Sequence, residues 1–331
     1  MRRGCVLLLG LLLVAWPCTA APYRIEVLQV GDIEAFSVVM QSTMKELNRL
    51  GLVLGRNVHI RRTVIEADIS QGDVNKDEIK ESADRIIAAR PNLVLAIGTP
   101  ATKIIKDKAV AARIPVVFTS VYDPLLVGSA SATQAGPGFT GVSIYVDPAD
   151  VLTVARLAFP GLKTLGIVHC GDETVLAFVN DVKTKARKLK MHVLAKQVRK
   201  TDKLTPAARA LIAQGARAFL IPVDTYYALR DYEPVRELID IQHQTRIPAI
   251  ACTIGGPKDP RGAVLLLTPS FQVIGELTGR QIAKILLQGR KPETLPILRQ
   301  EHVHVQVDTA IAKSLGITLP SQLLMMAKPR E

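Results

Sequence analysis

From Tyr23 onward the chain alternates between two hydrophobic patterns. Short apolar runs, such as residues 92–98 (NLVLAIG), are typical of strands buried on both faces. Longer segments with apolar positions three and four apart, such as residues 35–51, follow these runs and predict amphipathic helices. Strands that alternate with helices through short connections favour parallel sheets covered by helices on both faces.

This alternation runs through the chain twice. In the first half we expect strands at 24–30, 57–65, 92–98 and 114–118, and helices at 35–51, 77–89 and 100–111. In the second half we expect strands at 164–170, 191–198, 216–224 and 247–253, and helices at 173–190, 205–215 and 232–245. The phrase RIPVVFT at 113–119 is echoed by RIPAIAC at 246–252. The sequence therefore predicts an α/β fold of two doubly wound parallel-sheet lobes.

The last part of the chain predicts crossings between these lobes. It supplies a strand at 262–269, a helix at 270–289, a strand region at 295–307 and a helix at 309–316. Because this tail is too short for a third domain, we expect it to cross back and form a hinge, with a cleft that can close. We assign 21–142 and about 266–290 to the N-terminal lobe, and 143–265 and about 291–331 to the C-terminal lobe.

Residues 1–20 have the pattern of a cleavable signal peptide. Arg2 and Arg3 precede an apolar run, and small residues lead to a cleavage site after Ala20. Lipid attachment at Cys18 is less favoured, because Trp16 and Pro17 stand where small residues are expected. We therefore expect export to the periplasm as a monomer, with no later segment apolar enough to span a membrane.

The chain is basic. Its formal charge is +12, which becomes +10 without the signal peptide, and much of it lies in residues 183–203. That run has no aromatic side chains, and export separates the protein from nucleic acid, so we expect no nucleic-acid partner. A solvated helix face explains most of the run; attraction for anionic ligands or membrane surfaces is the alternative.

Cys170 and Cys252 are the cysteines left after the signal peptide. Two cysteines are too few for a disulfide scaffold in an oxidising compartment. Both follow predicted strands of the second half, so a bridge between them requires those strand ends to be neighbours. We expect another strand between them, which argues against a bridge without excluding it.

Several short phrases together resemble one protein family. They include GRNVHI, IGTPATK, IPVVFTSVYDPLLVG, FTGVS, FPGLKTLGIVH, IPVDTYY, ILLQGRKPETLPI and AKSLGITLP. In order and spacing, from Tyr23 to Pro320, the chain resembles the substrate-binding proteins of ABC transporters, in the group similar to tryptophan/tyrosine-binding proteins. The resemblance implies a type I periplasmic-binding-protein fold, a small-molecule ligand, an ABC permease as partner and no cofactor. The phrase GDIEAF, Phe139 and the segment IEADISQGDVNKDE depart from the family pattern, which leaves the ligand undefined.

Small polar residues follow several of the predicted strands. In open parallel sheets ligands bind beyond the carboxyl ends of the strands, where helix N-termini offer free N–H groups to a carboxylate. The phrase GTPAT at 98–102 is the best such position, since Thr99 can donate a hydrogen bond and the next helix starts at Pro100. Alternatively, Thr99 only caps that helix.

The same two interpretations apply to the other strand ends. Ser120 and Asp123 suit a ligand ammonium or hydroxyl, while Asp123 equally suits a turn before Pro124. In the second lobe, the acidic residues Glu173 and Asp224 can bind a ligand amino group or cap a helix. The rings of Tyr226 and Tyr227 can stack on a ligand or pack in the protein core. The predicted ligand contacts are Phe36, Thr99, Pro100, Ala101, Thr119, Ser120, Tyr122, Asp123, Glu173, Thr174, Asp224 and Thr225.

Enzyme motifs are absent from the sequence. It has no G-x-S-x-G elbow, Walker motif or H-E-x-x-H motif. His302 and His304 lack a third metal ligand, and adjacent His169 and Cys170 point to opposite faces of a strand. We expect no catalytic residue and no metal.

The leading hypothesis is that the protein is the solute-binding component of an ABC importer, with an amino acid or related carboxylate as its ligand. The alternative is a sensor that presents its closed form to a membrane kinase or chemoreceptor. A third hypothesis is an exported hydrolase.

Overall fold

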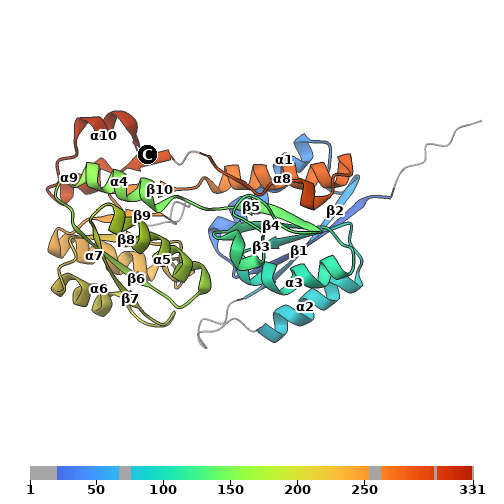
Figure 1. The fold of residues 1–331 in the computed structure, drawn as a ribbon, viewed down its shortest axis with the longest axis horizontal. Helices are drawn as coiled ribbons and strands as arrows, with labels where there is room; N and C mark the ends of the chain where they lie inside the picture. The colour runs from blue at the N-terminus through green and yellow to red at the C-terminus, as the bar shows by residue number, and fades with distance from the viewer. Residues whose placement is uncertain (1–20, 67–75, 253–261, 302–303, 330–331) are drawn as a thin grey trace, which may run out of the picture.

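The computed structural model describes residues 21–66, 76–252, 262–301 and 304–329 and shows two lobes side by side (Figure 1). Each lobe is a sheet with helices on both faces, which confirms the predicted α/β fold of two lobes. The expected signal peptide, part of the segment at 65–78 and His302 lie outside the described residues.

The first sheet is parallel throughout, in the strand order β11-β5-β4-β3-β1-β2. Every residue of β3 and β4 is buried, because helices cover both faces of the sheet. The helices α2 and α3 cover one face, and α1 and α8 cover the other. The strands are β1 (Tyr23–Val30), β2 (Val58–Ile65), β3 (Leu93–Ile97), β4 (Val116–Val121), β5 (Phe139–Ser143) and β11 (Leu298–Arg299); the helices are α1 (Glu34–Arg49), α2 (Lys76–Ala88), α3 (Thr99–Ala111) and α8 (Phe271–Gln288).

The contact between α1 and α8 depends on two glycines of α8. A Cβ atom on Gly275 would lie 2.4 Å from the Val39 carbonyl oxygen, and one on Gly279 would lie 2.9 Å from the Glu46 Cβ. Without these Cβ atoms the helices approach closely enough for the Thr43 hydroxyl to lie 3.1 Å from the Gly275 carbonyl oxygen. Residues 232 positions apart are thereby joined in one lobe.

The second sheet has the order β13-β12-β10-β9-β8-β6-β7, and its described pairs are parallel except for β10 with β12. Its helices again lie on both faces, and its core is continuous with residues of the hinge. The strands are β6 (Thr164–His169), β7 (His192–Gln197), β8 (Ala218–Ile221), β9 (Ala249–Ala251), β10 (Leu265–Thr268), β12 (His304–Val307) and β13 (Lys328–Pro329); the helices are α4 (Pro148–Ala158), α5 (Glu173–Lys188), α6 (Leu204–Ala213), α7 (Glu233–Thr245), α9 (Thr309–Ser314) and α10 (Ser321–Met326). Short 3-10 helices are η1 (Pro124–Val127), η2 (Thr225–Ala228) and η3 (Pro292–Thr294).

The chain passes between the two sheets after β5, after β10 and after β11. Sheet pairing places β10 in the second sheet and β11 in the first, so the chain crosses later than the boundaries expected at about 266 and 291. We propose crossings just after Thr268 and Arg299 as the lobe boundaries in this part of the chain.

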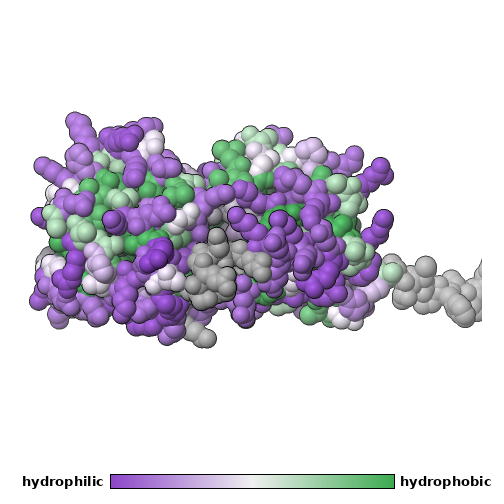
Figure 2. Space-filling model, turned by 90° about the horizontal axis from the view of Figure 1, so that it is seen from below, coloured by the Kyte–Doolittle hydropathy of each residue, from purple (hydrophilic) through white to green (hydrophobic). Residues whose placement is uncertain are grey.

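Hydrophilic residues cover most of both lobes on the face seen in Figure 2. Within the described residues, no helix is both long enough and apolar enough to traverse a lipid bilayer.

Candidate functional site

The two lobes touch where strands end and helices begin. The Thr174 hydroxyl, in the first turn of α5, donates to the Thr99 hydroxyl at the start of α3 with an O–O distance of 3.1 Å. Beside it, the Lys103 ammonium lies 2.7 Å from the Glu173 carboxylate. The carboxyl end of β3 therefore faces that of β6 across the interface between the lobes.

Neither of these helix N-termini has a side-chain cap. Gly98 precedes α3 with φ of 86°, and Asp172 precedes α5 without accepting a cap hydrogen bond. The first N–H groups of a helix have no partner within it, and they carry the positive end of the helix dipole. The N-termini of two helices therefore meet at this interface, and the Asp172 and Glu173 carboxylates at the start of α5 are paired with Lys200 and Lys103.

Ser120, near the end of β4, combines backbone strain with an unpartnered hydroxyl. Its φ of 59° is in the left-handed region, where a side chain costs roughly 1–2 kcal/mol. The side chain is buried, and its Oγ has no hydrogen-bond partner among the described residues. Pairing of β4 with β5 shifts register between Phe118 and Val121, which places Ser120 in an irregular stretch of the strand. Strain of this kind collects at functional sites.

The other predicted residues of the first lobe divide between this interface and the core. Phe36 is buried on α1, and its ring would lie 3.5 Å from a Cβ atom on Gly98, so it borders the start of α3. Thr119 shares a hydrogen bond of 2.9 Å with the Thr278 hydroxyl of α8. Pro100 is exposed in the first turn of α3, whereas Ala101 is buried in the core beneath that helix.

Tyr122 and Asp123 have structural partners. The Asp123 carboxylate accepts from the Leu125 backbone N–H at 2.9 Å and caps η1, in accordance with the turn interpretation. The buried Tyr122 ring packs against Phe178 of the second lobe, with 5.4 Å between ring centroids. Its hydroxyl lies 3.4 Å from the Asp181 carboxylate, and burial raises the pKa of Tyr122.

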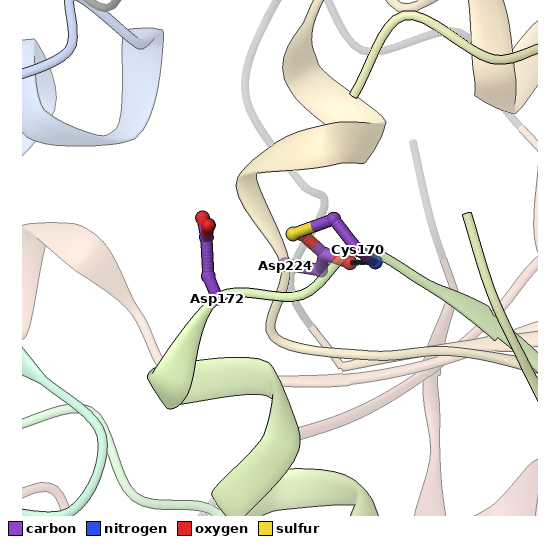
Figure 3. Close-up of side chains that lie close together, drawn as sticks. All are labelled: Cys170, Asp172 and Asp224. Atoms are coloured by element: carbon purple, nitrogen blue, oxygen red, sulfur yellow. Dashed lines mark hydrogen bonds between the residues drawn. The ribbon is translucent and has the colours of Figure 1, made fainter. Parts of the chain in front are cut away.

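In the second lobe, the Asp224 side chain lies against Cys170, and Figure 3 shows these two residues together with Asp172. Its carboxylate accepts from the Cys170 backbone N–H at 2.7 Å, the Cys170 thiol at 3.0 Å and the Tyr226 backbone N–H at 2.9 Å. Burial raises the pKa of Asp224. This carboxylate ties the end of β6 to the end of β8, so its contacts favour the capping interpretation.

Thr225 and the two tyrosines after it also face protein groups. The Thr225 hydroxyl lies 3.4 Å from the Asp172 carboxylate. The Tyr226 hydroxyl donates to the Asp202 carbonyl and the Tyr227 hydroxyl to the Val168 carbonyl, each at 2.9 Å. Both rings are buried, which places them in the core rather than against a ligand.

Cys170, Asp172 and Asp224 were not predicted to cluster, yet one side-chain atom of each lies within 4.8 Å of the others. The group does not suit a metal ion. The Asp224 carboxylate already accepts three hydrogen bonds from protein groups, and the Lys200 ammonium lies 2.8 Å from Asp172. The sequence signal for this cluster was the placement of these residues directly after neighbouring strands.

The Cys170 and Cys252 thiols are both buried and free. They follow β6 and β9, and β8 lies between those strands. This intervening strand separates the cysteines, as the argument from sequence expected.

The hinge contains a cavity of about 310 Å³. A network around the Lys185 ammonium borders it: this group lies 2.6 Å from the Asp147 carboxylate, 2.7 Å from the Tyr145 hydroxyl and 3.6 Å from Asp181. The pattern of residues did not indicate this network, because its members come from α5 and a crossing segment. The cavity is lined by Tyr122, Asp123, Pro124, Ala132, Ser143, Tyr145, Asp147, Ala177, Asp181 and Arg299.

The sequence was compared with models of known protein families, and the match covers most of the chain. A family model described as ABC transporter substrate binding protein matches residues 44–330. No curated protein sequence matches the chain.

Solved structures share the fold at low sequence identity. A conserved domain protein from Vibrio cholerae O1 superposes with a TM-score of 0.80 at 22% identity, covering 93% of this chain and 99% of that one. An ABC domain from Streptococcus pneumoniae in complex with L-Trp gives 0.77 at 20% identity, covering 92% and 99%. A ligand-free, open substrate-binding protein from Clostridium difficile gives 0.71 at 20% identity, covering 93% and 99%.

Proposed function

The chain belongs to the family of ABC transporter substrate-binding proteins, and on that premise we propose that it is the solute receptor of an ABC importer, with an amino acid or a related carboxylate as its ligand. Proteins of this family bind solutes rather than catalyse reactions. The importer partner, the ligand class and a periplasmic location after removal of residues 1–20 are parts of this proposal.

The observation that carries the ligand class is the charge at the interface between the lobes. The N-termini of α3 and α5 face each other there without side-chain caps. A carboxylate near these two helix ends, within reach of the Thr99 and Thr174 hydroxyls, can accept hydrogen bonds from the first N–H groups of the helices, which have no partner within the helix; Pro100 offers none. The S. pneumoniae fold neighbour, solved with L-Trp, is consistent with an amino-acid ligand.

Ser120 supplies a second reason to place the ligand here. A buried hydroxyl without a hydrogen bond costs roughly 1–3 kcal/mol, and a left-handed serine adds strain. A ligand that accepts from or donates to Ser120 Oγ recovers part of this cost. Because the ligand would contact both lobes only when they are close, its binding favours the closed form.

A thermal-shift screen of residues 21–331 with amino acids and small carboxylates tests this function, since a ligand that binds only the folded state raises the melting temperature. We expect a rise with at least one carboxylate, and a loss of affinity in Ser120→Ala and Thr99→Ala. Ser129→Ala is the matched control, because Ser129 Oγ is also buried without a partner among the described residues but lies in the loop after η1.

Unchanged affinity in both site variants would contradict the site, and the absence of any rise would contradict the ligand class. Uptake of the identified ligand by cells with and without the gene separates the importer from the sensor. Loss of uptake supports the importer, whereas normal uptake with intact binding supports the sensor that reports to a membrane kinase or chemoreceptor. Chemical turnover of the ligand would instead support an exported hydrolase.

A further inference from the structure

Four loops at one edge of the second sheet each carry a single basic residue. These are the loops that lead from α4 into β6, from α5 into β7, from α6 into β8 and from α7 into β9. Each contributes one exposed cation near its strand. The four residues, here called the basic row, are Lys163, Lys190, Arg217 and Arg246.

The sheet aligns the basic row. The strands β9, β8, β6 and β7 are parallel neighbours in that order, so the loops before them meet at the same edge. Neighbouring strands lie about 4.8 Å apart, which spreads the row over about 15 Å. The carboxyl ends of these strands face the first lobe, so the basic row lies at the opposite end of the second lobe, away from the interface between the lobes (Figure 1).

Among the described residues, no carboxylate forms an ion pair with the basic row. The four loops and the last turns of α4, α5, α6 and α7 contain no Asp or Glu, and the last turns add exposed Arg156, Arg187 and Lys188. None of these seven cations has an ion-pair partner among the described residues. The arginines that do form hydrogen bonds donate to backbone carbonyls: Arg156 to Leu189, Arg217 to Ala216 and Arg246 to Ser314.

Two residues of the basic row adopt a backbone conformation that favours glycine. Lys190 and Arg246 have φ of 54° and 60°, in the left-handed region that favours glycine. The chain does use glycine with positive φ in the other two loops, at Gly161 and Gly215. Cations near helix C-termini also interact with the helix dipole, but Lys163 and Arg217 lie two residues beyond those glycines, outside the last helical turn.

The corresponding edge of the first lobe differs. Its loops before β2, β3 and β4 carry Arg56, Arg90 and Arg113, so single cations recur there. These three arginines also form no ion pair with another described residue, but carboxylates lie near the ends of the helices beside them and neutralise other cations there. Asp84 lies near the end of α2 and pairs with Lys108, and Glu46 lies near the end of α1 and pairs with both Arg49 and Arg280.

We propose that the basic row docks the protein on an anionic lipid bilayer through the phosphates of its headgroups. This inference rests on the proposed function, because an importer's receptor works beside a membrane. A row of unpaired cations at the end of a lobe fits a flat anionic surface better than a small ligand. Nucleic acid is disfavoured because base stacking needs exposed rings, and Phe159, the one aromatic residue of these loops, packs against the core.

The test is co-sedimentation of residues 21–331 with vesicles of phosphatidylcholine alone or mixed with phosphatidylglycerol. The row variant combines Lys163→Gln, Lys190→Gln, Arg217→Gln and Arg246→Gln. A charge-matched control combines Lys45→Gln, Lys76→Gln, Arg290→Gln and Lys291→Gln. These exposed cations lie in or next to helices of the first lobe and form no ion pair with another described residue. Urea denaturation of each variant checks that it is folded.

We expect the wild type to bind the mixed vesicles and not the neutral ones, with an affinity that falls as salt increases. A basic residue near an anionic surface contributes about a fivefold gain in affinity, so the row variant should lose at least about tenfold and the control less than about threefold. Equal losses in the two variants, no binding to mixed vesicles, or tighter binding to a soluble RNA than to vesicles would overturn the proposal.

The ligand screen separates this inference from the proposed function. The basic row lies away from the strand ends, so the row variant should keep the ligand-induced rise in melting temperature. If the wild type binds a carboxylate but does not bind anionic vesicles, only the proposal that the basic row docks on lipid is contradicted. If the wild type binds the vesicles through the basic row but no solute raises its melting temperature, only the proposed solute site is contradicted.

Discussion

Ser120 in the first lobe and Asp224 in the second are both buried polar residues at the end of a central strand, but their surroundings are opposite. Asp224 accepts three hydrogen bonds that tie two strand ends together. Ser120 has a strained backbone and a hydroxyl without a partner among the described residues. A satisfied buried group stabilises the protein by itself, whereas an unsatisfied one gains only when something binds.

Removal of Asp224 should have the largest effect. In Asp224→Ala the N–H groups of Cys170 and Tyr226 lose their acceptor, so we expect the free energy of unfolding to fall by about 3 kcal/mol or more. Urea denaturation measures this. Asp123→Ala is the matched control, because it removes one cap hydrogen bond and should cost about 1 kcal/mol. Equal losses of stability in the two variants would contradict the conclusion that Asp224 stabilises the fold more than a single helix-cap hydrogen bond does.

Glu46, like Asp224, is a buried carboxylate with hydrogen-bond partners, but it lies between α1 and α8, outside the interface between the lobes. Hydrogen bonds from Arg49 lower the pKa of Glu46 from 4.5 to about 2. Burial acts in the opposite direction and raises the pKa, while a hydrogen bond from Arg280 lowers it further. A lowered pKa stabilises the folded state above the unfolded value, and this contribution is lost as pH falls from about 4.5 toward 2. Glu46→Gln should therefore cost about 2 kcal/mol at neutral pH, with the difference from wild type shrinking on acidification.

Denaturation at a series of pH values measures the Glu46 effect. Glu81→Gln, at an exposed position of α2, is the control and should change stability by less than about 0.5 kcal/mol. A Glu46 difference that stays constant down to pH 2 would show that the carboxylate's charge is not what stabilises the contact between α1 and α8.

Ser120→Gly should separate stability from binding. Glycine adopts the left-handed conformation without strain and carries no unsatisfied hydroxyl, so we expect the protein to gain roughly 1 kcal/mol of stability. The affinity for the solute should fall at the same time. Thermal unfolding and a ligand titration on the same sample measure both. A variant that loses stability as well would place Ser120 with Asp224, among residues that maintain the fold.

The ion pair between Lys103 and Glu173 should have the smallest effect. Both side chains are substantially exposed, at 43% and 59%, and such pairs contribute roughly 0.2–1 kcal/mol. In Lys103→Gln we expect ligand affinity to change by less than about fivefold, and the change to shrink further at high salt. A loss as large as that of Ser120→Ala would mean that this pair, rather than the hydroxyls beside it, controls closure.

The fold followed from the sequence because its strands are long apolar runs bounded by clear turn residues. Strands such as β3 and β4 are buried throughout, and a period of two or 3.6 residues identifies most of their neighbours. The crossings were harder to place. The strand β11 is two residues long and pairs with β5 far away in sequence, so its own pattern carries almost no information.

The site was less predictable, because residue type alone does not choose between a cap and a ligand contact. Asp123 and Asp224 both accept from a backbone N–H two residues ahead, which is a local interaction that sequence can suggest. The thiol of Cys170 reaches Asp224 only because β6 and β8 are neighbours in space. The left-handed Ser120 had no sequence signal, since glycine is the residue that normally marks that conformation.

The contact between α1 and α8 has a consequence for the order of folding. Because α8 covers one face of the first sheet, that sheet stays partly uncovered until α8 has been synthesised and its Gly275 has reached Thr43, 232 residues earlier in the chain. Such distant contacts form slowly, since a long loop must close first. The first lobe to begin synthesis is therefore completed only after β6 to β10 of the second lobe have been made.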